Sequence, residues 1–328
     1  MNKTKIEYLD YTWNPLAMRC SPVSEGCLNC WHLAMAKRLA KNPMISAEER
    51  GAYLEAEGWK GSPQLRNKEL EAPFHLKKPA RIGVQFMGDL FHESVSSRFI
   101  NSVIGIMTAE ETGHHMFFIL TKRPQKMRDY FKNFTKCGVI LSEFIEGVYL
   151  GVSVEDQKTA DERIPILLQI PAAKRFVSVE PMLGQVLLSQ DWQDYLEGWE
   201  TQAEHGRHDE YGNCVDCPIP VQVQTEKLDW VICGGETGPG ARPIHPDWIR
   251  SLRDQCQASG VPFFFKGWGE WLPVGQKPVS EFKPIGKNDA IERFHLWKDS
   301  DKNVSMKIGH KATGRLLDGR EWNETPCK

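Results

Sequence analysis

The sequence lacks the features that would place the chain in a membrane or outside the cell. It has no apolar run of about 18 residues, the length that a transmembrane helix requires. Its first residues, Met-Asn-Lys-Thr-Lys-Ile-Glu, carry lysines without the apolar core of a secretory signal. We therefore expect a globular protein of the cytoplasm that has no membrane partner.

Excess charge and repetition are also missing. The formal net charge is only −2 in 328 residues, which gives no global electrostatic argument for nucleic-acid binding and leaves room only for a local basic patch. The chain contains no internal repeat and no low-complexity tract. Its length suits one large domain or two ordinary ones.

Cysteine is present, and three of the nine cysteines stand close together. Cys20, Cys27 and Cys30 follow a short extended segment and precede a helical run. In a reducing cytosol, clustered cysteines are typical of metal or catalytic sites, and three is an odd number for disulfides. A cluster can bind three cysteines and leave one iron open for a ligand, so the spacing favours an iron–sulfur cluster. The alternative is a structural zinc site with His32 as fourth ligand, but only one of the paired Cys-x2-Cys elements typical of zinc is present.

The body of the chain alternates short apolar runs with amphipathic runs, which predicts a parallel sheet with connecting helices. About seven strands suit a complete or partial (β/α) TIM-like barrel, with a doubly wound open sheet as the alternative. We expect Pro124 and Pro246 to occupy the first turns of their helices. The predicted strands are 6–13, 82–87, 115–120, 147–152, 175–179, 229–233 and 261–265. The predicted helices are 29–41, 97–109, 124–132, 156–169 and 246–259.

Two segments interrupt this alternation. Residues 42–80 resemble an irregular insertion, and residues 185–227 form a second, polar and aromatic one. The second insertion contains His205, His208, Cys214 and Cys217, which have the ligand types of a small zinc site; a polar surface loop is the alternative. We assign residues 1–270 to the barrel and 271–328 to an extension that packs on it, with a turn at 317–320.

Polar side chains follow six of the predicted strands directly. In a parallel barrel these positions meet at one face, where function collects. The acids, lysines and arginine at these positions predict an active site there. The candidates at these strand ends are Gly88, Asp89, His92, Lys122, Arg123, Ser153, Glu155, Glu180, Gly234, Gly235, Glu236 and Lys266.

Three cysteines on the loop after the first strand resemble the motif of the radical S-adenosylmethionine superfamily. More narrowly, the chain resembles a phage-associated family of uncharacterised proteins with a variant three-cysteine motif. The stretches that carry this resemblance are 12–15, 20–30, 89–92, 120–124, 151–155, 176–181, 234–243, 263–266 and 268–270. The chain departs from the common superfamily motif by having six residues, not three, between Cys20 and Cys27.

The superfamily resemblance implies a four-iron–four-sulfur cluster on the three cysteines and S-adenosylmethionine bound to the open iron. It also implies an external electron donor and a 5′-deoxyadenosyl radical that abstracts a substrate hydrogen. Met87-Gly88-Asp89 stands where members of the superfamily bind the amino group of the cofactor. The literal Gly234-Gly235-Glu236 follows a later strand and is not its equivalent.

The remaining candidates have roles suggested by their chemistry. Lys122 and Arg123 would bind a carboxylate or a phosphate. Ser153 and Glu155 belong to the same expected cofactor site. Gly234-Gly235 would let a ligand come close to the main chain, and Glu236 would hold a ribose or an amine; a tight turn with a solvated glutamate is the alternative. Those roles lead to the following catalytic assignments. His92 would transfer protons, as would His245. Glu155 and Glu180 would bind ribose hydroxyls, and each, as a buried carboxylate, would need Lys266 or Arg123 nearby. Lys266 would be a base whose pKa is lowered by desolvation, or else an anchor for an anion.

Three functions follow from these features. The first is a radical S-adenosylmethionine-like enzyme that acts on a nucleotide or nucleic acid. The second is a zinc protein that binds nucleic acid or a partner without radical chemistry. The third is a barrel hydrolase or lyase that uses Glu155, Glu180 and Lys266.

Overall fold

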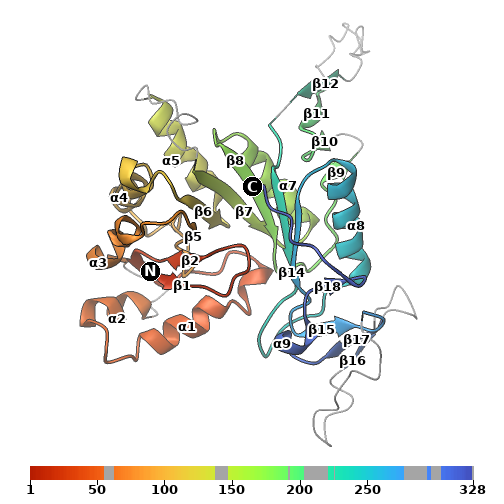
Figure 1. The fold of residues 1–328 in the computed structure, drawn as a ribbon, viewed down its shortest axis with the longest axis horizontal. Helices are drawn as coiled ribbons and strands as arrows, with labels where there is room; N and C mark the ends of the chain where they lie inside the picture. Colours follow the sequence, from red (N-terminus) through yellow and green to blue (C-terminus); the bar gives the residue numbers. More distant parts are fainter. Residues whose placement is uncertain are drawn as a thin grey trace, which may run out of the picture.

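The computed structural model describes residues 1–54, 63–136, 147–190, 193–202, 221–224, 226–276, 294–296 and 304–326. Its centre is an eight-stranded sheet in the order β1-β2-β5-β6-β7-β8-β13-β14 (Figure 1). β1 (Asn2–Lys3) is antiparallel to β2, and the other seven strands are parallel neighbours. The parallel strands are β2 (Tyr11–Trp13), β5 (Arg81–Val84), β6 (Met116–Thr121), β7 (Val148–Val154), β8 (Lys174–Val179), β13 (Trp230–Gly234) and β14 (Phe263–Gly267).

All seven predicted strands are present, although the first covers only the end of the segment 6–13. The parallel strands follow one another in chain order. Within the described ranges the order never reverses, whereas reversal is the mark of a doubly wound sheet. The prediction of a mixed α/β protein with a mostly parallel sheet is confirmed.

Within the described residues the parallel strands do not close into a complete barrel, because the outer side of the first and of the last parallel strand is already paired. β2 pairs with β1 on the side away from β5. The free edge of β14 binds the segment 322–324, through Phe265 N to Trp322 O at 2.9 Å and Glu324 N to Phe263 O at 3.2 Å. These main-chain hydrogen bonds leave neither strand free to close the sheet.

Prolines and capping residues mark the starts of several of the long helices. Pro124 and Pro246 are the first residues of their helices, as predicted. Asp156 forms a capping box with Thr159. These helices are α1 (Trp31–Leu39), α4 (Ser97–Met107), α5 (Pro124–Lys136), α7 (Gln157–Leu168) and α8 (Pro246–Ala258).

The prediction that 42–80 is irregular is wrong in part. Ser46 accepts a hydrogen bond from Glu49 N and starts a helix, and Ser46-x2-Glu49 is a capping signal that could have been recognised in the sequence. The elements in this insertion are α2 (Ala47–Tyr53), β4 (Gln64–Leu65), α3 (Asn67–Leu70) and a 3-10 helix (Ala72–His75); β4 pairs with β3 (Leu16–Ala17).

The second insertion and the segment after 271 form small antiparallel sheets beside the main one (Figure 1). The predicted turn at 317–320 is present: Asp318 and Gly319 both have positive φ and join β18 to β19. The strands are β9 (Ser189–Gln190), β10 (Gln193–Asp194), β11 (Trp199–Gln202), β12 (Val221–Gln224), β15 (Trp271–Pro273), β16 (Phe294–Leu296), β17 (Val304–Lys307), β18 (Leu316–Leu317) and β19 (Arg320–Glu321), and α9 is His310–Thr313. Across the described parts of the chain, no helix combines the length and apolarity needed to cross a membrane.

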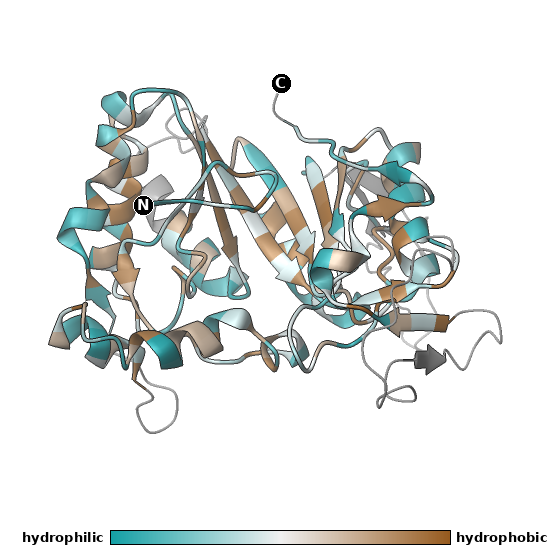
Figure 2. Ribbon diagram, turned by 60° about the horizontal axis from the view of Figure 1, so that its bottom comes forward, coloured by the Kyte–Doolittle hydropathy of each residue, from teal (hydrophilic) through white to brown (hydrophobic). Residues whose placement is uncertain are grey.

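The two faces of the main sheet bury different cores, because side chains alternate along each strand. One face contributes to the large apolar core that also contains helix residues, and the strands are correspondingly apolar in Figure 2. The opposite face is filled by an aromatic cluster, which Tyr8 of the N-terminal segment joins by packing on Trp230 and Phe264. The strand residues of this cluster are Phe118, Tyr149, Phe176, Trp230, Ile232 and Phe264. The same face becomes polar toward the carboxyl ends of the strands, which is where the candidate site lies.

Candidate active site

A cavity of about 720 Å3 lies at the carboxyl ends of the parallel strands. The loop with the three cysteines, the N-terminal segment and the region 310–315 also line it. It brings together twelve predicted site residues, which are Cys20, Cys27, Cys30, Gly88, Asp89, Lys122, Arg123, Ser153, Glu180, Gly235, Glu236 and Lys266. His92, Glu155 and Gly234 are not among its lining residues.

The cysteine loop lies against two groups of paired charged side chains at the ends of strands, Arg123 with Asp89 and Lys122 with Glu155. Cys27 ends a short 3-10 helix, and Cys30 directly precedes α1. Cys27 is buried, and Cys20 and Cys30 are half-buried. Across the part of the chain that the structure describes, no group of three or more His, Cys, Asp or Glu side chains is arranged to hold a metal ion.

The environments of the three thiols differ. Burial raises the pKa of Cys20 to about 12, and Asp89 adds to this. Burial also raises the pKa of Cys30. Burial would raise the pKa of Cys27 too, but the Lys122 ammonium and hydrogen bonds near Ser24 outweigh it and lower that pKa. A metal must therefore displace protons from the cysteines as it binds.

Arg123 fixes the first end of the cysteine loop. Its guanidinium donates to Ser21 O at 3.0 Å and Ser21 Oγ at 2.9 Å, and it lies 3.6 Å from Cys20 Sγ. It also pairs with Asp89 at 3.1 Å and with Glu93 at 2.9 Å. Thr121 donates a further hydrogen bond to the buried Asp89 at 2.7 Å. Arg123 thus binds both Asp89 and the cysteine loop. Both residues also line the cavity, so their direct binding of a cofactor stays a prediction.

Lys122 and Glu155 support the middle of the loop. Glu155 is almost fully buried and pairs with Lys122 and, at 3.3 Å, with Arg163. Ser24 Oγ donates to Glu155 at 2.7 Å. A Cβ on Gly26 would lie only 2.6 Å from Glu155 Cγ, so the loop rests directly on this ion pair. Glu155 is enclosed by these partners and does not line the cavity, which removes the ribose contact expected for it.

Lys266 and Glu180 form an ion pair on the far wall of the cavity. Lys266 Nζ lies 2.7 and 3.0 Å from the two Glu180 oxygens. The pair crosses β13 at Gly234, where a Cβ would lie 3.3 Å from Lys266 Cβ. Burial alone would lower the pKa of Lys266, but Glu180 outweighs it and the pKa is raised. The expectation of a lysine with a lowered pKa is therefore wrong.

Glu236 belongs to a clamp over the cysteine loop. Both of its oxygens bind Arg242, at 2.8 and 2.9 Å. Arg242 also donates to Glu25 O at 2.9 Å, and Asn29 donates to Gly240 O at 2.9 Å. Glu236 therefore ties the loop after β13 to the cysteine loop, where we had expected a ribose or amine ligand.

The glycine expectation is also corrected here. A Cβ on Gly235 would lie 2.2 Å from Trp268 O, so Trp268 main chain fills the space that we had reserved for a ligand.

The histidines have local partners. His92 binds Ser21 Oγ and Ser94 Oγ, each at 2.7 Å, and burial lowers its pKa. His245 caps the start of α8. His32 Nε2 accepts from Cys20 N at 3.2 Å, so this nitrogen supports the cysteine loop. His205, His208, Cys214 and Cys217 lie outside the described residues, and their zinc site stays a prediction.

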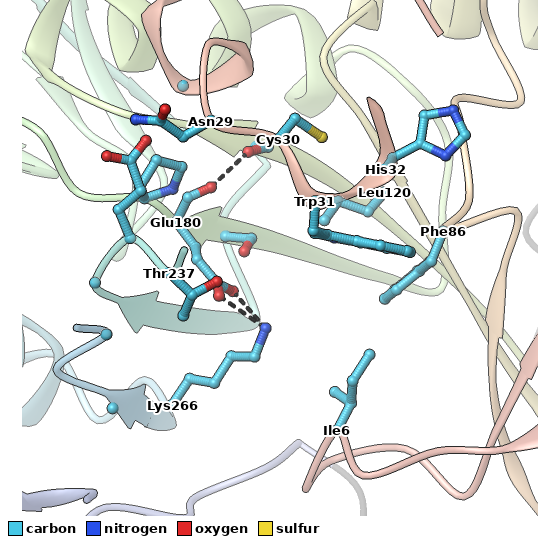
Figure 3. A pocket seen from close by; sticks show the side chains of 18 of the residues that line it. Ile6, Asn29, Cys30, Trp31, His32, Phe86, Leu120, Glu180, Thr237 and Lys266 are labelled. Atoms are coloured by element: carbon cyan, nitrogen blue, oxygen red, sulfur yellow. Dashed lines mark hydrogen bonds and ion pairs between the residues drawn. The ribbon is translucent and has the colours of Figure 1, made fainter. Parts of the chain in front are cut away.

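Sequence reasoning missed the role of Arg242, which holds the cysteine loop without lining the cavity, and it missed several residues that do line it. Arg242 had no signal beyond its place after a glycine-rich stretch. Ile6, Trp31 and Phe86 form an apolar part of the wall (Figure 3). Arg315 also lines the cavity. Their positions depend on how distant segments fold over the sheet.

A family model described as "Protein of unknown function (DUF5131)" matches residues 3–326. The chain belongs to this family. No curated protein and no solved structure matches it. The family description names no reaction, so arguments about function rest on the cavity.

Proposed function

We propose that this family member is an iron–sulfur enzyme of the radical S-adenosylmethionine kind, built on a partial (β/α) barrel. The observation that carries the proposal is that twelve predicted site residues, the three cysteines among them, line one cavity. Its volume of about 720 Å3 lies within the range of roughly 300–1,000 Å3 typical of small-molecule sites.

The donor set suits an iron–sulfur cluster. Three thiols on one short loop supply the ligands for three irons. Lys122 lowers the pKa of Cys27 and so favours its thiolate, the form that binds metal. Arg123 lies 3.6 Å from Cys20 Sγ, although Asp89 and Glu93 balance its charge. When bound, the cluster supplies one-electron reduction of S-adenosylmethionine, the chemistry that yields a 5′-deoxyadenosyl radical.

The residues of the chain would act by binding and positioning. Arg123 and His32 hold the loop at Cys20 through Ser21 and the Cys20 amide. Lys122 and Glu155 hold it near Cys27 through Ser24. The Arg242–Glu236 clamp ties it to the loop that follows β13. The cavity would bind S-adenosylmethionine beside the loop and a substrate, for which we propose a nucleotide or nucleic acid; an external donor would supply the electron.

Metal analysis of protein purified without oxygen tests the proposal. We expect about four irons and four sulfides per chain in the native protein and none in the Cys20→Ala, Cys27→Ala, Cys30→Ala variant. Cys256→Ala, a cysteine buried in the core away from the cavity, is the control and should keep its iron. The reduced native protein should then form 5′-deoxyadenosine from S-adenosylmethionine. Zinc in place of iron, lost in the triple variant, would overturn the radical mechanism.

A further inference from the structure

The cavity has two unlike walls beyond the cysteine loop. On one side lie Ile6, Trp31 and Phe86, and across from them lie Glu180 and Lys266 (Figure 3). Trp31 is 51% exposed, so much of its indole is open to a ligand. A planar ring is the ligand shape that such aromatic side chains bind best.

The opposite wall presents a donor and an acceptor side by side. The side chains of Lys266 and Glu180 stay 30% and 23% exposed, respectively, although they are paired. Gly234 beneath them lets the pair cross the strand, and the hydrogen bonds fix its orientation. An ammonium beside a carboxylate matches a ring edge that carries both acceptors and donors, as nucleobases do.

The N-terminal segment and the region 310–315 bring more positive than negative charge to the wall of the cavity. Lys5 and Lys311 line it, and neither makes a hydrogen bond or ion pair within the described residues. Arg315, which also donates to Phe265 O and Asn323, adds a third cation, and Glu7, 4.0 Å from it, is the one carboxylate that these two segments contribute to the lining. Three cations against one carboxylate favour an anionic group such as phosphate.

We propose that this part of the cavity binds a nucleoside monophosphate unit as the substrate. The base lies against Trp31 and Phe86 with its polar edge toward Lys266 and Glu180, and the phosphate lies at Lys5, Lys311 and Arg315. This assignment rests on the proposed function, since it places the nucleotide in the same cavity as the cysteines.

Calorimetric titration of the full-length protein with the four nucleoside 5′-monophosphates tests the site. The protein carries Cys20→Ala, Cys27→Ala and Cys30→Ala, with circular dichroism as the check on folding, so binding is measured without any metal. At least one monophosphate should bind, and S-adenosylmethionine at saturation should not displace it from the native protein. If no monophosphate binds to either protein, or if S-adenosylmethionine displaces it from the native one, the proposal is overturned.

Two variants distinguish the contribution of the base to binding from that of the phosphate. Trp31→Ala should weaken binding about 5- to 150-fold, the loss expected for one base–aromatic stack. Lys5→Gln with Lys311→Gln should lower the affinity for the monophosphate but leave the affinity for the corresponding nucleoside unchanged. Lys37→Gln with Lys41→Gln, which removes the same charge from exposed positions that do not line the cavity, is the control.

The outcomes distinguish this site from the proposed function. If tyrosine or tryptophan binds at this site and nucleotides do not, the Lys266–Glu180 pair binds the ammonium and carboxylate groups of an amino acid, and the nucleotide assignment is overturned. If the nucleotide binds as predicted but the native protein contains no iron, the site stands and the radical chemistry falls. If iron and 5′-deoxyadenosine are found without nucleotide binding, the radical chemistry stands and the nucleotide site is overturned.

Discussion

The ion pair of Arg123 with Asp89 should be among the most sensitive positions in the molecule. Arg123 is 7% exposed and Asp89 is 4% exposed. Arg123→Gln would leave the Asp89 carboxylate buried without the guanidinium that lies 3.1 Å away. Removing one partner of a buried pair costs about 3–5 kcal/mol, because the remaining charge is not compensated.

Urea unfolding measures this cost, in the Cys20→Ala, Cys27→Ala, Cys30→Ala background so that no metal contributes. Arg128→Gln is the control, since Arg128 lies in the helix α5 that follows Arg123 and pairs with an exposed Asp129; it should cost at most about 1 kcal/mol. Adding Asp89→Asn to Arg123→Gln removes both charges, so the two single effects should exceed the double effect by about 0.5–3 kcal/mol. A cost below about 1 kcal/mol for Arg123→Gln, or strictly additive effects, would refute the reasoning.

Three further predictions follow from other contacts. Gly151→Ala places a Cβ 2.4 Å from the Phe176 ring and should lower the free energy of unfolding by about 1–3 kcal/mol. The control Gly105→Ala, in a helix with open space around this position, should raise the free energy of unfolding by about 0.5–1 kcal/mol. Equal effects of the two variants in urea unfolding would contradict this prediction. Burial lowers the pKa of His115, so the unfolded chain binds a proton that the folded chain does not, and stability should fall as pH drops below about 6.5. His115→Gln should reduce that fall, which urea midpoints on either side of this pH measure; an unchanged pH dependence would count against it. Arg242→Gln breaks the clamp over the cysteine loop and should lower iron affinity about 10- to 100-fold in a chelator competition, while unchanged iron retention would disprove the clamp's role.

Most of the main sheet could be predicted from the sequence, because its parallel strands are apolar on both faces. β7 illustrates this, since each of its residues from Val148 to Val154 is buried. The edges could not be predicted, because β1 and the segment 322–324 carry no strand pattern and pair only through the fold. The sequence therefore left a complete and a partial barrel both open, and only the structure shows that the described sheet does not close.

For the candidate site, the sequence located the residues better than it assigned their roles. Strand-end positions placed Asp89, Lys122 and Glu180 at the cavity, because parallel strands bring their carboxyl ends together. It could not show which charges pair with each other, because Lys122 with Glu155 and Arg123 with Asp89 join residues over 30 positions apart. Lys266 is the clearest case: its desolvation and a carboxylate nearby were both foreseen, but only the structure shows that Glu180 outweighs the desolvation and raises the pKa.

The pairing of 322–324 with β14 has a consequence for how the chain folds during synthesis. The strand emerges from the ribosome well before the segment that covers its edge. Until that segment is made, an apolar strand in the nascent chain presents unpaired main-chain groups to any neighbour. Domains usually fold as units while they are synthesised, and this one must wait for its last pairing partner. A chain that stops short of residue 322 should therefore be prone to aggregation, even though it contains every strand of the main sheet and every cysteine of the loop.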